Sequence, residues 1–324
     1  MHKNISQGEN IDEDDQSDDI RQDSFQLMND LHILISCLKA YCMNETTECF
    51  FDFRELMGAH GYLMVSAIPS WIQIWSPNVT LEGDAYVLYQ QTTKKLVKIA
   101  SMIKEGESFE NKLYPYMKEL FQNRHPIDSS SDIESSDTLL DILKTSLLIS
   151  LEQLSESLDQ NEDIPHDTKW NKMYQLDISN VSKLHAVYML ANVFVQGVNT
   201  IEATENVKFA LAMLSKLFLC DAILRYSDSA LLHNYITAAH LEQIHELNQT
   251  IIQNLRKYIV ALSEVATICE PFHYSSVLDS KNDTYLEDLF EYSKNSKLNS
   301  KQKIDSIDQY IKPLSQKLRI VAKI

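Results

Sequence analysis

The segment VTLEGDAYVLYQQ, residues 79–91, marks a helix start in a chain that contains only six glycines. Asp84 follows Gly83 directly, and apolar residues then recur at helical spacing as far as about Ile103. An acidic residue in the first turn stabilises a helix because it faces the positive end of the helix dipole. The segment therefore predicts a helix that begins at Asp84.

The composition extends this prediction to the whole chain of 324 residues. Six glycines and seven prolines supply few turn formers for an all-β fold, and 44% hydrophobic residues are enough to build a core. Other segments carry apolar residues at three- and four-residue steps, as an amphipathic helix does: residues 24–41, 139–154, 181–198, 207–226 and 241–262. We expect an all-α protein made of two helical bundles.

Two polar segments suggest where the domains begin and end. Residues 1–24 hold eight acidic residues and almost no apolar ones, which is typical of a disordered tail. HPIDSSSDIESSD, residues 125–137, has no apolar periodicity and indicates a linker over residues 123–137. The predicted helical domains are then residues 25–122 and 138–324.

Charge and hydropathy exclude several classes of function. The net charge of -17 argues against nucleic-acid binding, because phosphate recognition needs a basic face. No apolar run reaches the ~18 residues that a membrane span requires. Five cysteines without CxxC spacing favour a reducing compartment and core or surface thiols over a metal site: Cys37, Cys42, Cys49, Cys220 and Cys269.

The last three residues, Ala322-Lys323-Ile324, have the small-basic-aliphatic form of a peroxisomal targeting signal. Isoleucine stands where leucine is usual, so the tripeptide predicts weak targeting to peroxisomes. Without that signal the expected location is the cytoplasm.

Three of the six glycines lie within residues 58–83: two are in Gly58-Ala59-His60-Gly61-Tyr62, and the third is Gly83. Glycines beside a helix start allow a ligand to approach the backbone and leave N–H groups free to meet an anion. Glu82, directly before Gly83, can act as a general base where a pocket excludes water. From spacing alone, the favoured interpretation of Glu82 is a residue that stabilises the positive end of the helix dipole.

The order of these motifs resembles the peroxisomal acyl-CoA oxidases. Residues 31–98, which contain RELMGAHGYLMVSAIPSWIQIWSPNVTLEGDAYVLYQQ, are similar to that family's C-terminal flavin-domain segment, with its Gly-Gly-His-Gly-Tyr turn and Thr-Phe-Glu-Gly-Glu-Asn step before a helix. The resemblance continues over most of the chain, through residues 184–188, 214–218, 276–299 and 310–314.

The resemblance implies the helical bundles of the C-terminal α-domains of acyl-CoA oxidase/dehydrogenase-like flavoproteins. It implies an FAD-dependent oxidoreductase acting on a CH–CH bond with O₂ as acceptor, which converts acyl-CoA to trans-2-enoyl-CoA and H₂O₂ in peroxisomal fatty-acid β-oxidation. Glu82 matches the catalytic base. The residues that match the lining of the flavin and thioester pocket are Gly58, Ala59, Gly61, Gly83 and Asp84. We interpret His60 as structural, and His185 and Tyr188 as packing residues.

The resemblance also implies only the C-terminal half of such an oxidase, without the N-terminal helical domain and the β-domain. Three departures from the family pattern stand against full activity: Ala59, Ala85 and residues 279–283. The alternative is a non-catalytic, oxidase-like subunit that pairs with an intact homologue. In either case we expect a homo-oligomer or hetero-oligomer, such as a dimer, and an isolated chain that is inactive and binds no FAD.

Overall fold

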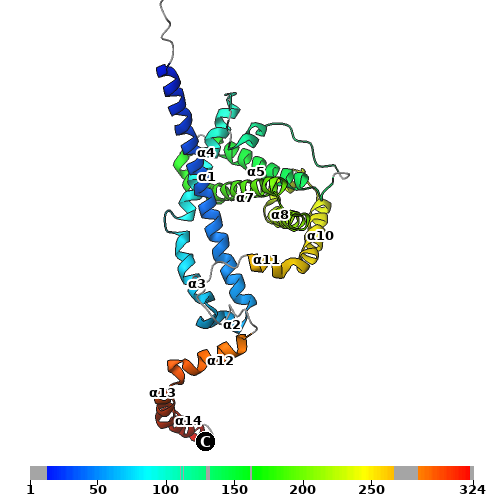
Figure 1. Cartoon of the computed structure of the whole chain (residues 1–324). Coiled ribbons are helices and arrows are strands. Elements are labelled where there is room, and N and C mark those ends of the chain that lie inside the picture. The colour runs from blue at the N-terminus through cyan, green and yellow to red at the C-terminus, as the bar shows by residue number, and fades with distance from the viewer. Residues whose placement is uncertain are drawn as a thin grey trace, which may run out of the picture. The chain divides into compact units, whose positions relative to one another are not determined.

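The computed structural model describes residues 13–109, 111, 113–128, 132–160, 163–265 and 284–321. Within these ranges the chain forms helices and no β-strand, which confirms the all-α prediction (Figure 1). The chain divides into two compact units, Met1–Thr47 with Ser76–Glu264 and Glu48–Trp75 with Val265–Ile324. Each unit is described separately below.

The first unit is a bundle in which α5 contacts both α7 and α8, α8 contacts α10, and α4 contacts α7. Every predicted segment after residue 84 is helical, but α7 begins six residues before the expected residue 181, and the segment expected as one helix over residues 241–262 is divided into α10, η5 and α11. The bundle helices are α4 (Ala85–Lys104), α5 (Ser136–Asp159), α7 (Gln175–Thr200), α8 (Glu205–Tyr226) and α10 (Ala238–Leu255).

Shorter elements connect these helices. They are η2 (Ser76–Val79), η3 (Pro115–Glu119), α6 (His166–Thr168), η4 (Lys169–Met173), α9 (Asp228–Leu232), η5 (Arg256–Tyr258) and α11 (Ile259–Val265).

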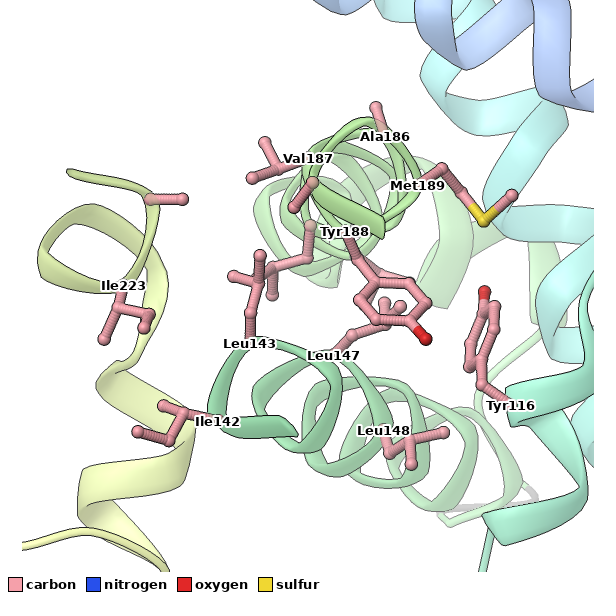
Figure 2. Packing of buried hydrophobic residues seen from close by; sticks show 14 of the residues in the cluster. Tyr116, Ile142, Leu143, Leu147, Leu148, Ala186, Val187, Tyr188, Met189 and Ile223 are labelled. Atoms are coloured by element: carbon pink, nitrogen blue, oxygen red, sulfur yellow. The ribbon is translucent and has the colours of Figure 1, made fainter. Parts of the chain in front are cut away.

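The core of the first unit is formed by aliphatic side chains of α5 that face α7 and α8 (Figure 2). Leu143 and Leu147 are fully buried, and each such leucine contributes about 2–3 kcal/mol of transfer free energy. Figure 2 shows further members of this cluster: Ile142, Leu148, Ala186, Val187, Tyr188, Met189 and Ile223.

The first long helix, α1 (Glu13–Leu56), starts earlier than the sequence indicated. The sequence predicts this helix from residue 24, but the backbone is already helical from Glu13, so residues 13–24 of the predicted disordered tail are helical. An acidic segment without an apolar stripe is typical of a disordered tail. A helix that packs through its later residues can nevertheless extend toward its N-terminus into such a polar segment. Residues 1–12 lie outside the described part of the chain.

The described residues of the expected linker are bonded to helices and loops of the first unit. The Ile127 amide donates to the Tyr235 carbonyl at 2.9 Å, and the Arg124 guanidinium pairs with Glu152 at 2.7 Å. The compact units therefore divide the chain elsewhere than at residues 123–137, and the predicted domain boundaries of 25–122 and 138–324 remain a prediction.

In the second unit the end of α1 is followed by α2 (Ala59–Tyr62), η1 (Met64–Ser66) and α3 (Ile68–Trp75). Phe50 stacks on Trp71 with ring centroids 6.3 Å apart and lies 6.4 Å from Trp75. The two tryptophans one helical turn apart thus share one aromatic partner. The unit also contains α12 (Tyr285–Asn295), η7 (Lys297–Asn299), α13 (Lys301–Ser306), η8 (Ile307–Ile311) and α14 (Lys312–Val321).

Two predictions fall outside the described residues: the departure at residues 279–283 and the terminal Ala322-Lys323-Ile324. Across the helices that are described, none is both long and apolar enough to span a membrane.

Candidate functional site

Glu82 lies in an unusual backbone conformation immediately before α4. Its φ is +58°, a left-handed value that L-residues other than asparagine and aspartate seldom adopt, and its side chain is exposed. Such a residue costs about 1–2 kcal/mol and persists where the surrounding structure holds it. Ala67, Phe121 and Asn234 have similar φ values, so the conformation defines the geometry of the Glu82 turn and does not by itself assign a function.

Gly83 continues the turn with a φ of +113°. A Cβ on this residue would lie 3.1 Å from Cδ2 of Leu88, on the first turns of α4. Both the backbone conformation and the close approach of Leu88 favour glycine here. Gly83 therefore fixes how the chain enters α4 and where Glu82 leaves it.

Asp84 is the N-cap of α4, as the predicted helix start at this residue indicated. Its Oδ1 accepts a hydrogen bond from the Tyr86 amide at 2.9 Å. This contact corrects part of the sequence interpretation, because the Tyr86 amide is already satisfied by Asp84 and is not free to meet an anion. Asp84 is exposed, and the structure shows it as the capping residue of α4.

Lys39 of α1 was not singled out from the sequence. Its ammonium group donates to the Gly83 carbonyl at 2.6 Å and lies 3.4 Å from the Val79 carbonyl. The turn that carries Glu82 is therefore held by the charged side chain of a residue that precedes Gly83 by 44 positions in the sequence. The sequence around Lys39 reads as an ordinary amphipathic helix and carries no signal for this contact.

Apolar side chains surround the Glu82 turn in the first unit. Leu81, Tyr86 and Val87 are exposed by 57%, 51% and 51%. An exposed carboxylate with apolar neighbours suits a ligand that combines an apolar chain with a reacting polar group. Glu82 itself is exposed to solvent within the first unit.

The glycine window, residues 58–62, belongs to the second unit. Gly58, with a φ of +57°, precedes α2, and a Cβ on it would meet nothing within 4 Å. Ala59 and His60 are exposed. A Cβ on Gly61 would lie 2.2 Å from the Arg54 carbonyl oxygen, so Gly61 is required for close packing of α2 against the end of α1. The structure thus explains Gly61 without a ligand.

The six predicted site residues accordingly fall in two sets. Glu82, Gly83 and Asp84 are consecutive residues of the first unit, whereas Gly58, Ala59 and Gly61 belong to the second.

His185 and Tyr188 lie in the core of the first unit, as predicted for packing residues. His185 Nδ1 is 2.6 Å from the Tyr116 hydroxyl, and Tyr188 contacts the Tyr116 ring edge-on with centroids 4.8 Å apart. Burial lowers the pKa of His185 to about 3, because the charged imidazolium would lose its hydration. His185 is therefore neutral at physiological pH.

Two surface hollows of the first unit are lined by other residues than the predicted site. One includes Arg124, Glu152 and His233, and the other includes Ile133 and Leu247. Because Arg124 already pairs with Glu152 at 2.7 Å, the first hollow offers no free guanidinium to an anionic ligand.

Cys37 and Cys220 are buried free thiols. Burial raises the pKa of Cys37 to about 12 and that of Cys220 to about 11. Cys269 lies outside the described residues. In the parts of the chain that the structure covers, no group of three His, Cys, Asp or Glu side chains is placed to hold a metal ion.

Comparison with known proteins gives two matching family models: "Acyl-CoA oxidase, C-alpha1 domain" over residues 1–97 and "Acyl-CoA oxidase" over residues 135–316. Acyl-coenzyme A oxidase acox-1.1 of Caenorhabditis elegans is 26% identical over 307 residues, which are 93% of this chain and 44% of the relative. Peroxisomal acyl-coenzyme A oxidase 1 of Cavia porcellus is 26% identical over 313 residues, with 93% and 46% covered. The chain thus spans less than half the length of these relatives.

Solved structures show the same fold. Acyl-CoA oxidase-1 of Caenorhabditis elegans, complexed with FAD and ATP, superposes with a TM-score of 0.82 at 24% identity, covering 93% of this chain and 46% of that one. Acyl-CoA oxidase 1 of Arabidopsis thaliana gives a TM-score of 0.80 at 21% identity, covering 94% and 46%. With a family model matching more than half of its residues, the chain belongs to the acyl-CoA oxidase family.

Proposed function

We propose that this chain provides the catalytic base and one wall of the active site of an FAD-dependent acyl-CoA oxidase. The reaction is the oxidation of acyl-CoA to trans-2-enoyl-CoA with production of H₂O₂. The observation that carries the proposal is the exposed Glu82 carboxylate, held in a left-handed turn at the start of α4 in a member of this family.

Glu82 takes the proton from the α-carbon of the acyl-CoA. The thioester carbonyl makes that proton acidic, and a carboxylate within hydrogen-bond reach of it can accept it. The apolar Leu81, Tyr86 and Val87 beside the turn exclude water once an acyl chain lies against them, which strengthens the carboxylate as a base.

FAD, when bound, supplies the acceptor for the hydride that leaves the β-carbon and passes the electrons to O₂. Gly58 and Ala59 fit a place beside it, because both are exposed and no side chain fills the space next to Gly58. Gly61 and Gly83 act by shaping the backbone, since each is packed against protein atoms, and Asp84 acts by capping α4.

The exposed site residues of either unit, taken by itself, do not enclose a cofactor. A cofactor that stays bound through purification is buried on most sides. Glu82 and Asp84 in one unit, and Gly58 and Ala59 in the other, are all exposed. We therefore propose that FAD is retained only when further protein surface covers these residues.

We place the activity in peroxisomal fatty-acid β-oxidation. The proposal rests on relatives that are named peroxisomal and on Ala322-Lys323-Ile324 at the end of the sequence.

A second candidate function is a non-catalytic subunit that pairs with an intact homologue. It is favoured by exposed apolar side chains on one helix, α1, where Leu27, Met28, Leu31 and Ile35 are 45–68% exposed. Contiguous apolar residues at such a surface mark a site of association. Ala59 and Ala85, which depart from the family pattern, are consistent with lost catalysis.

Replacing Glu82 by Gln in an assembly that contains this chain and shows oxidase activity separates the two functions. Under the catalytic proposal peroxide formation falls to background while FAD and acyl-CoA remain bound. Unchanged turnover would favour the non-catalytic subunit.

A further inference from the structure

Lys39 connects α1 with both ends of the turn that carries Glu82. Its Nζ atom lies 2.6 Å from the Gly83 carbonyl oxygen and 3.4 Å from the Val79 carbonyl oxygen. Thr80, Leu81 and Glu82 are the residues between these two carbonyls. A hydrogen bond from a charged ammonium group is stronger than one between neutral groups, so this contact limits how far the turn can move.

The backbone of the turn needs such a restraint. Glu82 and Gly83 have consecutive positive φ values of +58° and +113°. A left-handed non-glycine residue relaxes to the more common regions of φ and ψ unless its neighbours prevent it. Pro77 fixes the preceding residues, since its carbonyl accepts from the Thr80 and Leu81 amides at 3.0 and 2.9 Å. Lys39 acts on the following side, at Gly83.

Three contacts between α1 and α4 do not involve Lys39. The Thr92 hydroxyl donates to the Ile33 carbonyl at 3.3 Å, the Lys95 ammonium pairs with Asp30 at 3.3 Å, and Asn44 Nδ2 donates to the Tyr89 hydroxyl at 3.3 Å. These contacts lie along the two helices and none of them touches residues 79–83. Loss of the Lys39 ammonium therefore leaves the helices joined and releases the turn.

We propose that Lys39 is a positioning residue for Glu82: its ammonium group, by holding the Gly83 and Val79 carbonyls, sets the direction in which the Glu82 carboxylate leaves the backbone. The inference rests on the proposed role of Glu82 as the base. It adds a residue that touches neither acyl-CoA nor FAD and acts through the backbone alone.

Amide hydrogen exchange on the purified chain tests the restraint without any cofactor. Lys39→Met removes the ammonium and keeps the apolar stem, and Lys104→Met is the matched control, because Lys104 pairs with Asp159 at the other end of α4. We expect exchange at the Thr80 and Leu81 amides, which donate to the Pro77 carbonyl, to become at least about tenfold faster in Lys39→Met and to stay as in the wild type in Lys104→Met. Equal exchange in Lys39→Met and the wild type, or an equal increase in both variants, would overturn the inference.

Kinetics in an active assembly test the consequence for Glu82. A misplaced base slows proton transfer and leaves ground-state binding intact, so Lys39→Met lowers kcat by about tenfold with an unchanged KM. Lys39→Arg, which keeps a charged donor, recovers part of kcat, whereas a merely structural loss would alter both constants. An unchanged kcat in Lys39→Met, alongside loss of activity in Glu82→Gln, would refute the role of Lys39 and leave that of Glu82 intact. Should Lys39→Met not fold, as judged by circular dichroism, Lys39→Gln takes its place in both measurements.

Discussion

The Tyr116 hydroxyl lies 2.6 Å from Nδ1 of His185, inside the apolar core of the first unit. The other ring nitrogen of His185, Nε2, is buried and has no hydrogen-bond partner among the described residues. The imidazole is therefore neutral. Its protonation would place a positive charge in the core, where the Tyr116 hydroxyl is the hydrogen-bond partner that the described residues supply.

The first prediction is a loss of stability at mildly acidic pH. The folded-state pKa of His185 is about 3, below the ~6.5 of an unfolded histidine. Below pH ~6.5 the unfolded chain binds a proton at His185 that the folded chain does not bind. The contribution of neutral His185 to the free energy of unfolding is therefore complete above pH ~6.5 and declines as the pH falls toward 3. Between pH 6.5 and 4.5 the loss is about 2 kcal/mol, measured as the shift in the free energy of urea unfolding.

The control for this prediction is a variant without the buried imidazole. His185→Phe should reduce the pH dependence between 6.5 and 4.5, while His233→Phe, at an exposed residue, should leave it unchanged. Identical pH profiles for the wild type and His185→Phe would contradict the burial argument.

The second prediction contrasts two glycines. Gly61→Ala brings a Cβ to 2.2 Å from the Arg54 carbonyl oxygen, so the end of α1 and α2 must move apart, at a cost of about 2 kcal/mol or more. Gly197→Ala, in α7, meets nothing within 4 Å and should stabilise by about 0.5–1 kcal/mol. Thermal unfolding of both variants measures the difference, and equal midpoints would contradict the packing described for Gly61.

The third prediction concerns the isolated chain. Because Gly58, Ala59, Glu82 and Asp84 are exposed, we expect purified protein to be helical by circular dichroism, colourless, inactive toward acyl-CoA and larger than a monomer on sizing. Ile35→Glu, on the exposed apolar face of α1, should shift it toward the monomer. A yellow protein with stoichiometric FAD would show that the chain alone completes the site.

The fourth prediction concerns location. A fluorescent protein carrying the last twelve residues of the sequence should enter peroxisomes weakly, because isoleucine replaces the usual leucine at the end. Removing Ala322-Lys323-Ile324 from that fusion should leave it diffuse. A diffuse signal from the intact fusion as well as from the full chain would argue against the targeting signal.

The sequence predicted those features that depend on local patterns. Apolar periodicity located the bundle helices, and Asp84 indicated the start of α4, because capping depends on neighbouring residues. The start of α1 was placed too late, since an acidic segment without an apolar stripe gives no sign that a packed helix continues through it. The contact of Lys39 with Gly83 could not be predicted from local sequence patterns. It spans forty-four positions, a relationship that arises only when α1 packs on α4.

The candidate site was predictable to a similar degree. The motif made Glu82 the candidate base, which stays a prediction, whereas the positive φ of Glu82 and the requirement of Gly61 for packing are properties of the folded backbone. The expectation of free amides at the start of α4 failed at Tyr86, since the Asp84 side chain accepts that hydrogen bond.

The most direct test of the account is α-proton abstraction by Glu82. In an active assembly containing this chain, under anaerobic conditions in D₂O, exchange of the acyl-CoA α-proton for deuterium is followed for the wild type, Glu82→Gln and the control Glu105→Gln. Glu105 is an exposed glutamate at the far end of α4, so its variant keeps the same change of charge away from the turn. We predict that exchange falls by at least about a hundredfold in Glu82→Gln and stays at the wild-type rate in Glu105→Gln. Exchange at the wild-type rate in Glu82→Gln, with acyl-CoA still bound, would contradict the assignment of Glu82 as the base.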